Sequence, residues 1–389
     1  MAARTRLLDA TSFFLTISVF MTQPIIPVYL YQVLGASEQE VGVIIALMSV
    51  TAALLRAPSS IWIKNEYILR VLIFGLCLNT FSLLGYGISW DPLIFSIFRT
   101  THGAAIALNY TLMLSLSSMI ARSDQVETSI TSYTMFLAMG LWTGPALGTF
   151  LRSFVGLRAL MFISSLIGLI SILIGVFLMK KVHGFWTKIC FSKIMRRDLS
   201  ASLKMPALLP TLIYLCFSFL IGAVTAYAPL RAKLGFGLED QLIILLFTMY
   251  YFIVFSMRVI LLRIEFFRKR IGAVKLLYIS LFSSGFGALL IGLGPRLEFF
   301  ISGLCLASFA HGFIFPLTAS MAAQMTPIHL RVLSNSVYLT AFDIGNLLGS
   351  VTVAVMLGFF SLPISLAAAA IPLFLGLIAV RKLSRVYVE

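Results

Sequence analysis

The chain has 389 residues, of which 60% are hydrophobic and 11% are charged, whereas soluble proteins carry about 25% charged residues. This composition and a mean hydropathy of +1.02 exclude a water-soluble fold and indicate a multi-pass membrane protein in a lipid bilayer. The net charge of +15 would suit nucleic acid only if it formed a basic surface, and its distribution among the loops argues against a nucleic-acid partner.

Long apolar stretches recur along the chain. A helix needs about 20 such residues to cross a bilayer, and lipid-embedded backbone forms helices because its polar groups need internal partners. We therefore predict an all-α membrane protein with twelve transmembrane helices, at 8–32, 40–62, 70–89, 92–118, 129–152, 158–180, 208–230, 240–263, 272–293, 298–322, 333–358 and 361–381. The first stretch contains Gln23 and two prolines and is long for a signal peptide, so we interpret it as a retained span.

Most of the 29 lysines and arginines fall in loops on the side of the N-terminus. The positive-inside rule then predicts that both termini are cytoplasmic, in the plasma membrane. The longest polar stretch divides the chain into a six-helix bundle at 1–180, a cytoplasmic basic linker at 181–207 and a second six-helix bundle at 208–389. The basic and aromatic residues of this linker suit either a helix on an anionic leaflet or a solvated connection.

The two halves carry a weak internal repeat. Corresponding features are "THGAAIAL" at 101–108 and "AHGFIFPL" at 310–317, the sets Tyr133, Gly140, Gly144 and Tyr338, Gly345, Gly349, and the late-span residues Arg56 and Arg258. Two parallel six-helix halves that are pseudo-symmetric about an axis along the membrane normal form a transporter architecture, with substrate bound between them near the midplane.

The fifth predicted span contains an unusual stretch, "GLWTGPALG" at 140–148. Gly140, Gly144 and Gly148 recur every four residues, so they line one helix face and allow another backbone to approach closely. Pro145 removes a backbone donor and bends the helix. Generic close packing would explain the same stripe. We expect this motif, with Gly345 and Gly349, to form a seam between the two halves.

Several of these motifs resemble those of the major facilitator superfamily. "GLWTGPALG" is similar to the fifth-helix motif typical of its proton-driven exporters, "RTTHGAAIA" at 99–107 resembles its fourth-helix motif, and "AFDIG" at 341–345 resembles its eleventh helix. The loop after the second span departs from the family pattern, since Ser60 stands where glycine is expected and Lys64 where aspartate is expected. The resemblance implies a monomeric proton-coupled exporter with twelve spans.

Ionisable residues within the spans are functional candidates, because buried charge is costly in a bilayer. Arg99 and His102 share a face of the fourth predicted span. Asp343 is the only acidic residue of the sequence near the middle of any predicted span, and His311 corresponds to His102 in the internal repeat. We interpret these four as candidates for proton coupling or gating. The alternatives are an Arg99 that caps backbone carbonyls, an Asp343 paired permanently with Arg99, Arg258 or a helix N-terminus, and a His311 held in a helix interface.

Arg56 and Arg258 lie near the inner ends of their spans and are candidates for an inner gate, although Arg258 could also snorkel to the surface. A second set shares polar or aromatic side chains within the spans. These candidates for lining a substrate cavity are Gln23, Asn109, Tyr133, Trp142, Tyr227 and Tyr338.

The sequence shows no nucleophile–base pair, metal-ligand spacing or phosphate-binding glycine loop, so we expect neither an enzyme nor a cofactor or metal. We predict a secondary active transporter that exports a small apolar or weakly polar solute by alternating access, with protons as the coupling partner. The alternatives are an uptake symporter or uniporter for a sugar or organic anion, and a non-transporting receptor or scaffold.

Overall fold

A computed structural model of the chain describes residues 2–63, 67–120, 126–182, 205–263, 272–325 and 331–386. Eleven helices in these ranges are long and apolar enough to cross a membrane. One further long helix carries Arg99, His102 and Asn109, which lower its hydropathy. The prediction of an all-α, multi-pass membrane protein is confirmed, and the twelve predicted spans agree with these helices.

The first half of the chain forms α1 (Ala2–Phe20), a 3₁₀ turn (Gln23–Ile25), α2 (Ile26–Gln32), α3 (Glu38–Trp62), α4 (Ile68–Ile88), α5 (Pro92–Ile120), α6 (Val126–Arg152) and α7 (Leu157–Val182). The second half forms α9 (Met205–Leu230), a π-helical turn (Arg231–Gly235), α10 (Asp240–Arg263), α11 (Ala273–Leu293), α12 (Leu297–Gln324), α13 (Arg331–Met356), α14 (Leu362–Ala367) and α15 (Ala370–Leu383).

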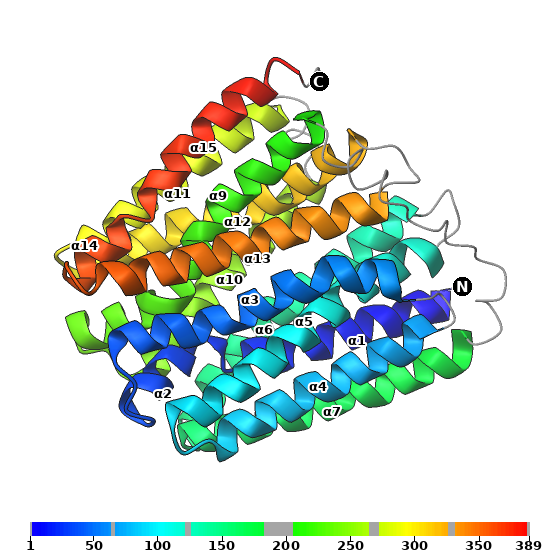
Figure 1. The fold of residues 1–389 in the computed structure, drawn as a ribbon, viewed down its shortest axis with the longest axis horizontal. Coiled ribbons are helices and arrows are strands. Elements are labelled where there is room, and N and C mark those ends of the chain that lie inside the picture. Colours follow the sequence, from blue (N-terminus) through cyan, green and yellow to red (C-terminus); the bar gives the residue numbers. More distant parts are fainter. Residues whose placement is uncertain are drawn as a thin grey trace.

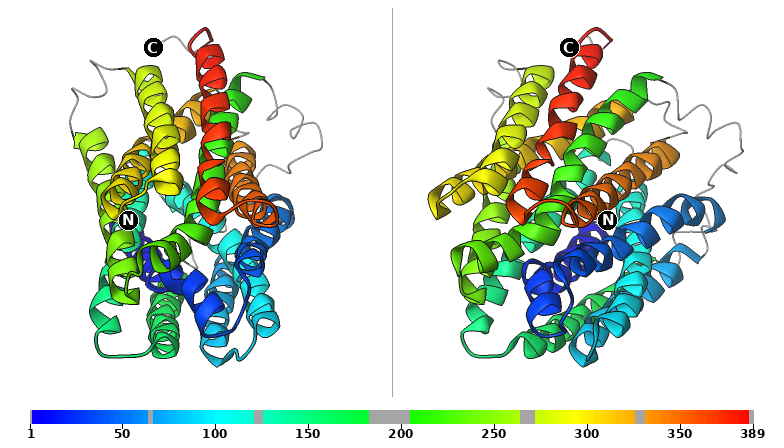
Figure 2. Two further views of the ribbon diagram at one scale, coloured as in Figure 1. Left: turned by 90° about the vertical axis from the view of Figure 1, so that its left-hand side faces the viewer. Right: turned by 60° about the vertical axis from the view of Figure 1, so that its left-hand side comes forward.

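The helices pack in two groups, α1–α7 and α9–α15, which lie side by side (Figures 1 and 2). The groups meet mainly where α3 packs on α13 and α6 packs on α10. The predicted linker at 181–207 falls mostly on residues 183–204, outside the described residues. We call the end of the bundle where α1 begins and α15 ends the terminus end, and the other end the far end (Figure 1).

The first and last spans are both interrupted, and in the last span α14 ends at Ala367 before α15 begins at Ala370. α1 and α2 are separated by the turn at Gln23–Ile25, where Pro24 and Pro27 remove two backbone donors. At the far end, α3 begins with a capping box: the Ser37 hydroxyl accepts from the Glu40 N–H, and a Glu40 carboxylate oxygen lies 2.7 Å from the Ser37 N–H. These local signals fix where the chain reverses between α2 and α3.

The glycine stripe of α6 packs on α1, within the first half. A Cβ added at Gly144 would lie 3.0 Å from the carbonyl oxygen of Ile17 and from the amide nitrogen of Met21. Gly140 and Gly148 face α1 in the same way. The expected seam between the halves is therefore wrong for α6, because its small residues are taken up by the neighbouring helix of the same half.

The counterpart stripe of α13 behaves alike in the second half. Gly345 lies against the Leu215 carbonyl of α9, and Gly349 against the Phe219 carbonyl. A side chain at either position would meet the backbone of α9. The pairs α1–α6 and α9–α13 thus use equivalent glycines to bring two backbones together, which is close packing inside each half.

Candidate functional site

A buried ion pair joins the two halves. The Arg56 Nε of α3 lies 2.7 Å from Asp343 Oδ2 of α13, and its Nη2 lies 3.2 Å from Oδ1. The third guanidinium nitrogen, Nη1, donates to the Thr111 hydroxyl of α5 at 3.1 Å. The two side chains are only 3% and 4% exposed. Each charge is therefore shielded from solvent and is stabilised by the other.

This pair brings together two residues that the sequence analysis placed in different roles. Asp343 was a coupling candidate and Arg56 a gate candidate. The partners considered for Asp343 were Arg99, Arg258 or a helix N-terminus, and the structure replaces all of them with Arg56. Arg56 lies in the last third of α3 and Asp343 at the middle of α13, so both residues belong to helices that can span a membrane rather than to a loop.

The halves also meet through polar contacts at the far end. Asp240, the first residue of α10, accepts from Arg152 Nη2 at 3.0 Å and from Lys233 Nζ at 2.8 Å. The Gln241 amide donates to the Ser153 hydroxyl at 2.7 Å. Arg152 and Ser153 belong to the first half and the other three to the second. We call these five residues the far-end network.

Aromatic contacts continue between α6 and α10. The Trp142 ring lies 5.8 Å from the Phe252 ring and 6.3 Å from the Phe255 ring. Tyr227 of α9 places its hydroxyl against Gly42 of α3. Two of the predicted cavity residues, Trp142 and Tyr227, therefore lie between the halves, where they fill the interface.

A second polar cluster lies inside the first half. Arg99 is fully buried, and its Nη1 lies 3.4 Å from both Gln23 Oε1 and the Tyr86 hydroxyl. That hydroxyl is 2.8 Å from His102 Nδ1. Arg99, His102 and Gln23 are thus brought together as predicted candidates, whereas Asp343 is elsewhere. Tyr86 was missed, and its only sequence signal is a tyrosine between two glycines near the end of a span.

A third cluster lies inside the second half, around Arg258. Arg258 is 8% exposed, and its guanidinium carbon lies 5.2 Å from the centre of the Phe315 ring. Its Nε and Nη1 have no hydrogen-bond partner among the described residues. Arg258 does not snorkel, and in the part of the chain that the structure describes it forms no ion pair across the halves.

Tyrosines surround this arginine. The Tyr338 hydroxyl lies 2.8 Å from Thr318 Oγ1 and donates to the Phe315 carbonyl at 3.1 Å. The Tyr214 ring stacks on the Tyr338 ring at 4.5 Å. Tyr338 was a predicted cavity residue, whereas Tyr214 was missed because an aromatic residue in an apolar span has no distinguishing pattern.

The comparisons with known proteins decide the family. The family model described as Major Facilitator Superfamily matches residues 8–268. The chain belongs to the Major Facilitator Superfamily. It is a membrane transporter, not an enzyme. A search of curated proteins gave no match.

Solved structures of other transporters share this fold. A bacterial homologue of the human lysosomal transporter Spinster, in an inward-facing and unoccupied conformation, has a TM-score of 0.72 and 14% identity over 99% of this chain and 98% of its own. The human organic anion transporter MFSD10 (TETRAN) has a TM-score of 0.69 and 14% identity, covering 97% and 98%. The peptide transporter POT with alafosfalin has a TM-score of 0.76 and 10% identity, covering 98% and 94%.

The remaining candidates of this superfamily member lie within single halves. Asn109 faces Gly75 of α4, so it packs between α4 and α5 rather than toward the second half. Tyr133 is buried in the core of the first half. The His311 Nδ1 lies 3.1 Å from the Tyr250 hydroxyl, which is the helix-interface arrangement considered as its alternative role.

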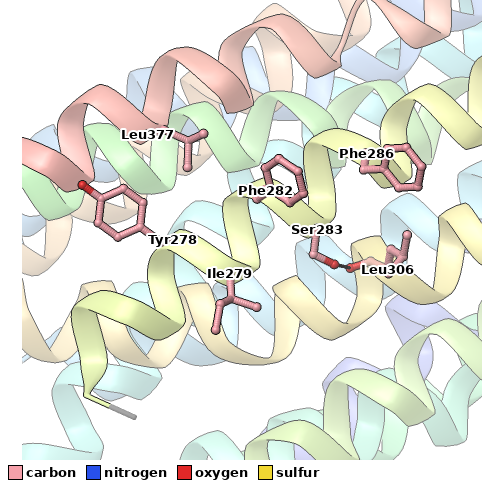
Figure 3. Close-up of a pocket in the computed structure, with 7 residues that line it drawn as sticks. All are labelled: Tyr278, Ile279, Phe282, Ser283, Phe286, Leu306 and Leu377. Carbon is pink, nitrogen blue, oxygen red and sulfur yellow. Dashed lines mark hydrogen bonds between the residues drawn. The ribbon is translucent and has the colours of Figure 1, made fainter.

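A groove of about 500 Å³ runs over the surface of the second half (Figure 3). Its lining comes from α11, α12 and α15: Tyr278, Ile279, Phe282, Ser283, Phe286, Leu306 and Leu377. The Ser283 hydroxyl donates to the Leu306 carbonyl at 3.2 Å, so the groove offers little beyond apolar surface. Such a surface on a spanning bundle suits lipid chains, and it plays no part in the site between the halves.

Proposed function

We propose that this transporter moves a small solute by alternating access of its two halves, driven by proton exchange and in the direction of export. The buried Arg56–Asp343 pair is the observation that carries the proposal. It joins the halves within the membrane, and such a pair must break before the halves can separate at that level.

The chemistry of the pair suggests how a proton would drive this step. While both groups are charged, separating them leaves two unpaired charges in a low-dielectric interior, which costs several kcal/mol. A proton on Asp343 removes one charge, and Arg56 keeps its hydrogen bond to Thr111. We infer that protonation of Asp343 releases the pair and that deprotonation restores it.

The far-end network would oppose this movement at the other end. Its contacts bridge the two halves at the far end in the state described here. Alternating access requires them to break when the far end opens. The distribution of lysine and arginine supports a cytoplasmic terminus end, in the plasma membrane. The likeness of 140–148 to the motif of proton-driven exporters supports export by a monomer.

Arg99 and His102 are proposed as a second part of the proton pathway. The His102 Nε2 has no hydrogen-bond partner among the described residues, while its Nδ1 is held by Tyr86. A histidine with one anchored and one free nitrogen can pass a proton without changing its position.

Proton movement in proteoliposomes tests this function. Purified protein is reconstituted with a trapped pH-sensitive dye and challenged with lipophilic cations, sugars and organic acids. We expect a substrate-dependent pH change in the direction of exchange, lost in Asp343→Asn and reduced in Arg99→Ala. Asp9→Asn is the matched control, because Asp9 lies within the first half and accepts from Ser132 at 2.7 Å.

Two outcomes would contradict the proposal. Substrate movement without proton movement, unchanged in Asp343→Asn, would identify a uniporter. A pH change in which protons and substrate move together would identify an uptake symporter and exclude exchange.

A further inference from the structure

Arg258 is a buried cation whose charge the described chain leaves uncompensated. Its Nε and Nη1 are buried without a hydrogen-bond partner among the described residues. No described carboxylate forms an ion pair with it. An unpaired charge within a membrane is costly, so Arg258 is a candidate to bind an anionic group that the described residues do not supply.

The packing of Arg258 determines which groups could bind. The guanidinium carbon of Arg258 lies over the Phe315 ring, 5.2 Å from its centre, and this cation–π contact offsets part of the charge. A carboxylate can bind a guanidinium along its Nε–Nη2 edge or its Nη1–Nη2 edge. Each of these edges of Arg258 has one buried nitrogen, Nε or Nη1, without a hydrogen-bond partner among the described residues. This planar fork matches the two oxygens of a carboxylate.

The surrounding rings would contact the remainder of such a ligand. Tyr214, Tyr338 and Phe342 form a stack, with ring centres 4.5 and 5.5 Å from that of Tyr214. The Phe315 ring centre lies 5.6 Å from that of Tyr214 and 6.1 Å from that of Tyr338. The rings come from α9, α12 and α13, and they form an apolar wall beside the cation.

We propose that Arg258 is the recognition site for an organic carboxylate whose aromatic or alkyl part packs on the rings of Tyr214 and Phe315. This inference rests on the proposed transport function, for which it names the substrate class. Tyr214 stacks on Phe342 with 5.5 Å between ring centres, and Phe342 directly precedes Asp343 in α13. The ligand would therefore bind beside the ion pair that joins the halves.

Arg99 is a weaker candidate for the same role. It is also buried with two unpartnered nitrogens, but Gln23 and the Tyr86 hydroxyl lie near its Nη1. Stacked rings lie near both arginines, since the Tyr86 and Phe95 ring centres are 4.3 Å apart, so Gln23 and the Tyr86 hydroxyl, the two neutral hydrogen-bond partners of Arg99, are what distinguishes it from Arg258. We therefore assign the carboxylate to Arg258.

Equilibrium binding to purified protein in detergent tests the assignment without any gradient. The probes are benzoate, phenylacetate, cyclohexanecarboxylate and hexanoate, each compared with its uncharged amide. We expect at least one carboxylate to bind saturably while its amide does not. Arg258→Gln should weaken that binding about 10- to 100-fold, as the loss of charge-assisted hydrogen bonds predicts. Arg258→Lys should retain part of the carboxylate binding, and this result would show that the variant site still folds.

Arg231→Gln is the matched control. Arg231 lies 4.8 Å from the Phe236 ring centre but also donates to the Gly294 carbonyl at 3.3 Å, so its loss should leave binding unchanged. The inference is overturned if no carboxylate binds the unaltered protein, if Arg258→Gln binds as well as the unaltered protein, or if Arg99→Gln alone abolishes binding. Carboxylate binding through Arg258 without proton movement in liposomes would refute the proposed function and leave the site standing.

Discussion

Neutralising Asp343 should release the two halves near the terminus end. Asp343→Asn removes the charge that faces Arg56 but keeps one acceptor oxygen, so Arg56 is left buried with its hydrogen bond to Thr111. Breaking a buried pair by removing one partner costs about 3–5 kcal/mol. Because the asparagine keeps an acceptor, we take about 3 kcal/mol, which corresponds to a shift of about 100-fold in the population of the joined state.

Spin-label distances can measure this shift. Labels at positions 55 and 344 flank the pair on α3 and α13, and both native side chains are 38% exposed, so labels there should not disturb packing. The four native cysteines are replaced by serine. We expect the distance distribution to gain a longer component in Asp343→Asn. The Arg56→Gln/Asp343→Asn double variant should lie closer to the unaltered protein, because two neutral amides can hydrogen-bond to each other.

The double variant also separates mechanics from proton coupling. It should restore the distances but not the substrate-dependent proton movement, since no titratable carboxylate remains at position 343. An unchanged distance distribution in Asp343→Asn, together with normal proton movement, would refute the reasoning. It would show that the pair neither holds the halves nor carries the proton.

Three further predictions concern other contacts. Ser153→Cys and Gln241→Cys, joined by a short cross-linker that forms disulfides, should stop transport until reductant cleaves the link. Each single variant is a control. Continued transport in the cross-linked protein would show that the far end does not open. Gly144→Ala should lower the unfolding temperature, since overpacking against α1 costs about 1–3 kcal/mol. Gly156→Ala is the control and should leave the unfolding temperature unchanged, because an added Cβ there meets nothing within 4 Å. Equal unfolding temperatures of the two variants would contradict the close-packing argument. Tyr86→Phe should reduce proton movement with little change in unfolding temperature, because one hydrogen bond of about 1 kcal/mol is lost, and full proton movement would reduce Tyr86 to packing.

The spans could be predicted because each is a continuous apolar run whose length matches the bilayer. The grouping of Arg99 with His102 was also accessible, since residues three apart share a helix face. That Gln23 approaches them was not, because it depends on how α1 and α2 pack on α5.

Contacts between distant helices were beyond the sequence. Arg56 and Asp343 are far apart along the chain and belong to different halves. Each has several oppositely charged residues as potential partners, and only the packing of α3 on α13 selects this one. The loop after α3 departs from the family pattern at Ser60 and Lys64, and the gate role predicted for Arg56 did not name its partner.

The glycine stripes show a different limit. Spacing every four residues predicts a close approach by another backbone but does not say which one. Both stripes face a helix of their own half, where α1 and α9 supply the backbone. A stripe of small residues thus identified an interface and left its partner undetermined.

The interruption between α1 and α2 has a mechanical consequence. A continuous helix resists bending because bending lengthens the backbone hydrogen bonds on one side of the helix. At Pro24 and Pro27 two of these bonds are absent from the start, so the seven residues of α2 can change direction relative to α1 at small enthalpic cost. Gln23 lies in this turn, and its side-chain oxygen is 3.4 Å from Arg99 Nη1. A change of direction between α1 and α2 would therefore move a hydrogen-bond partner of Arg99, the most deeply buried cation described in the first half.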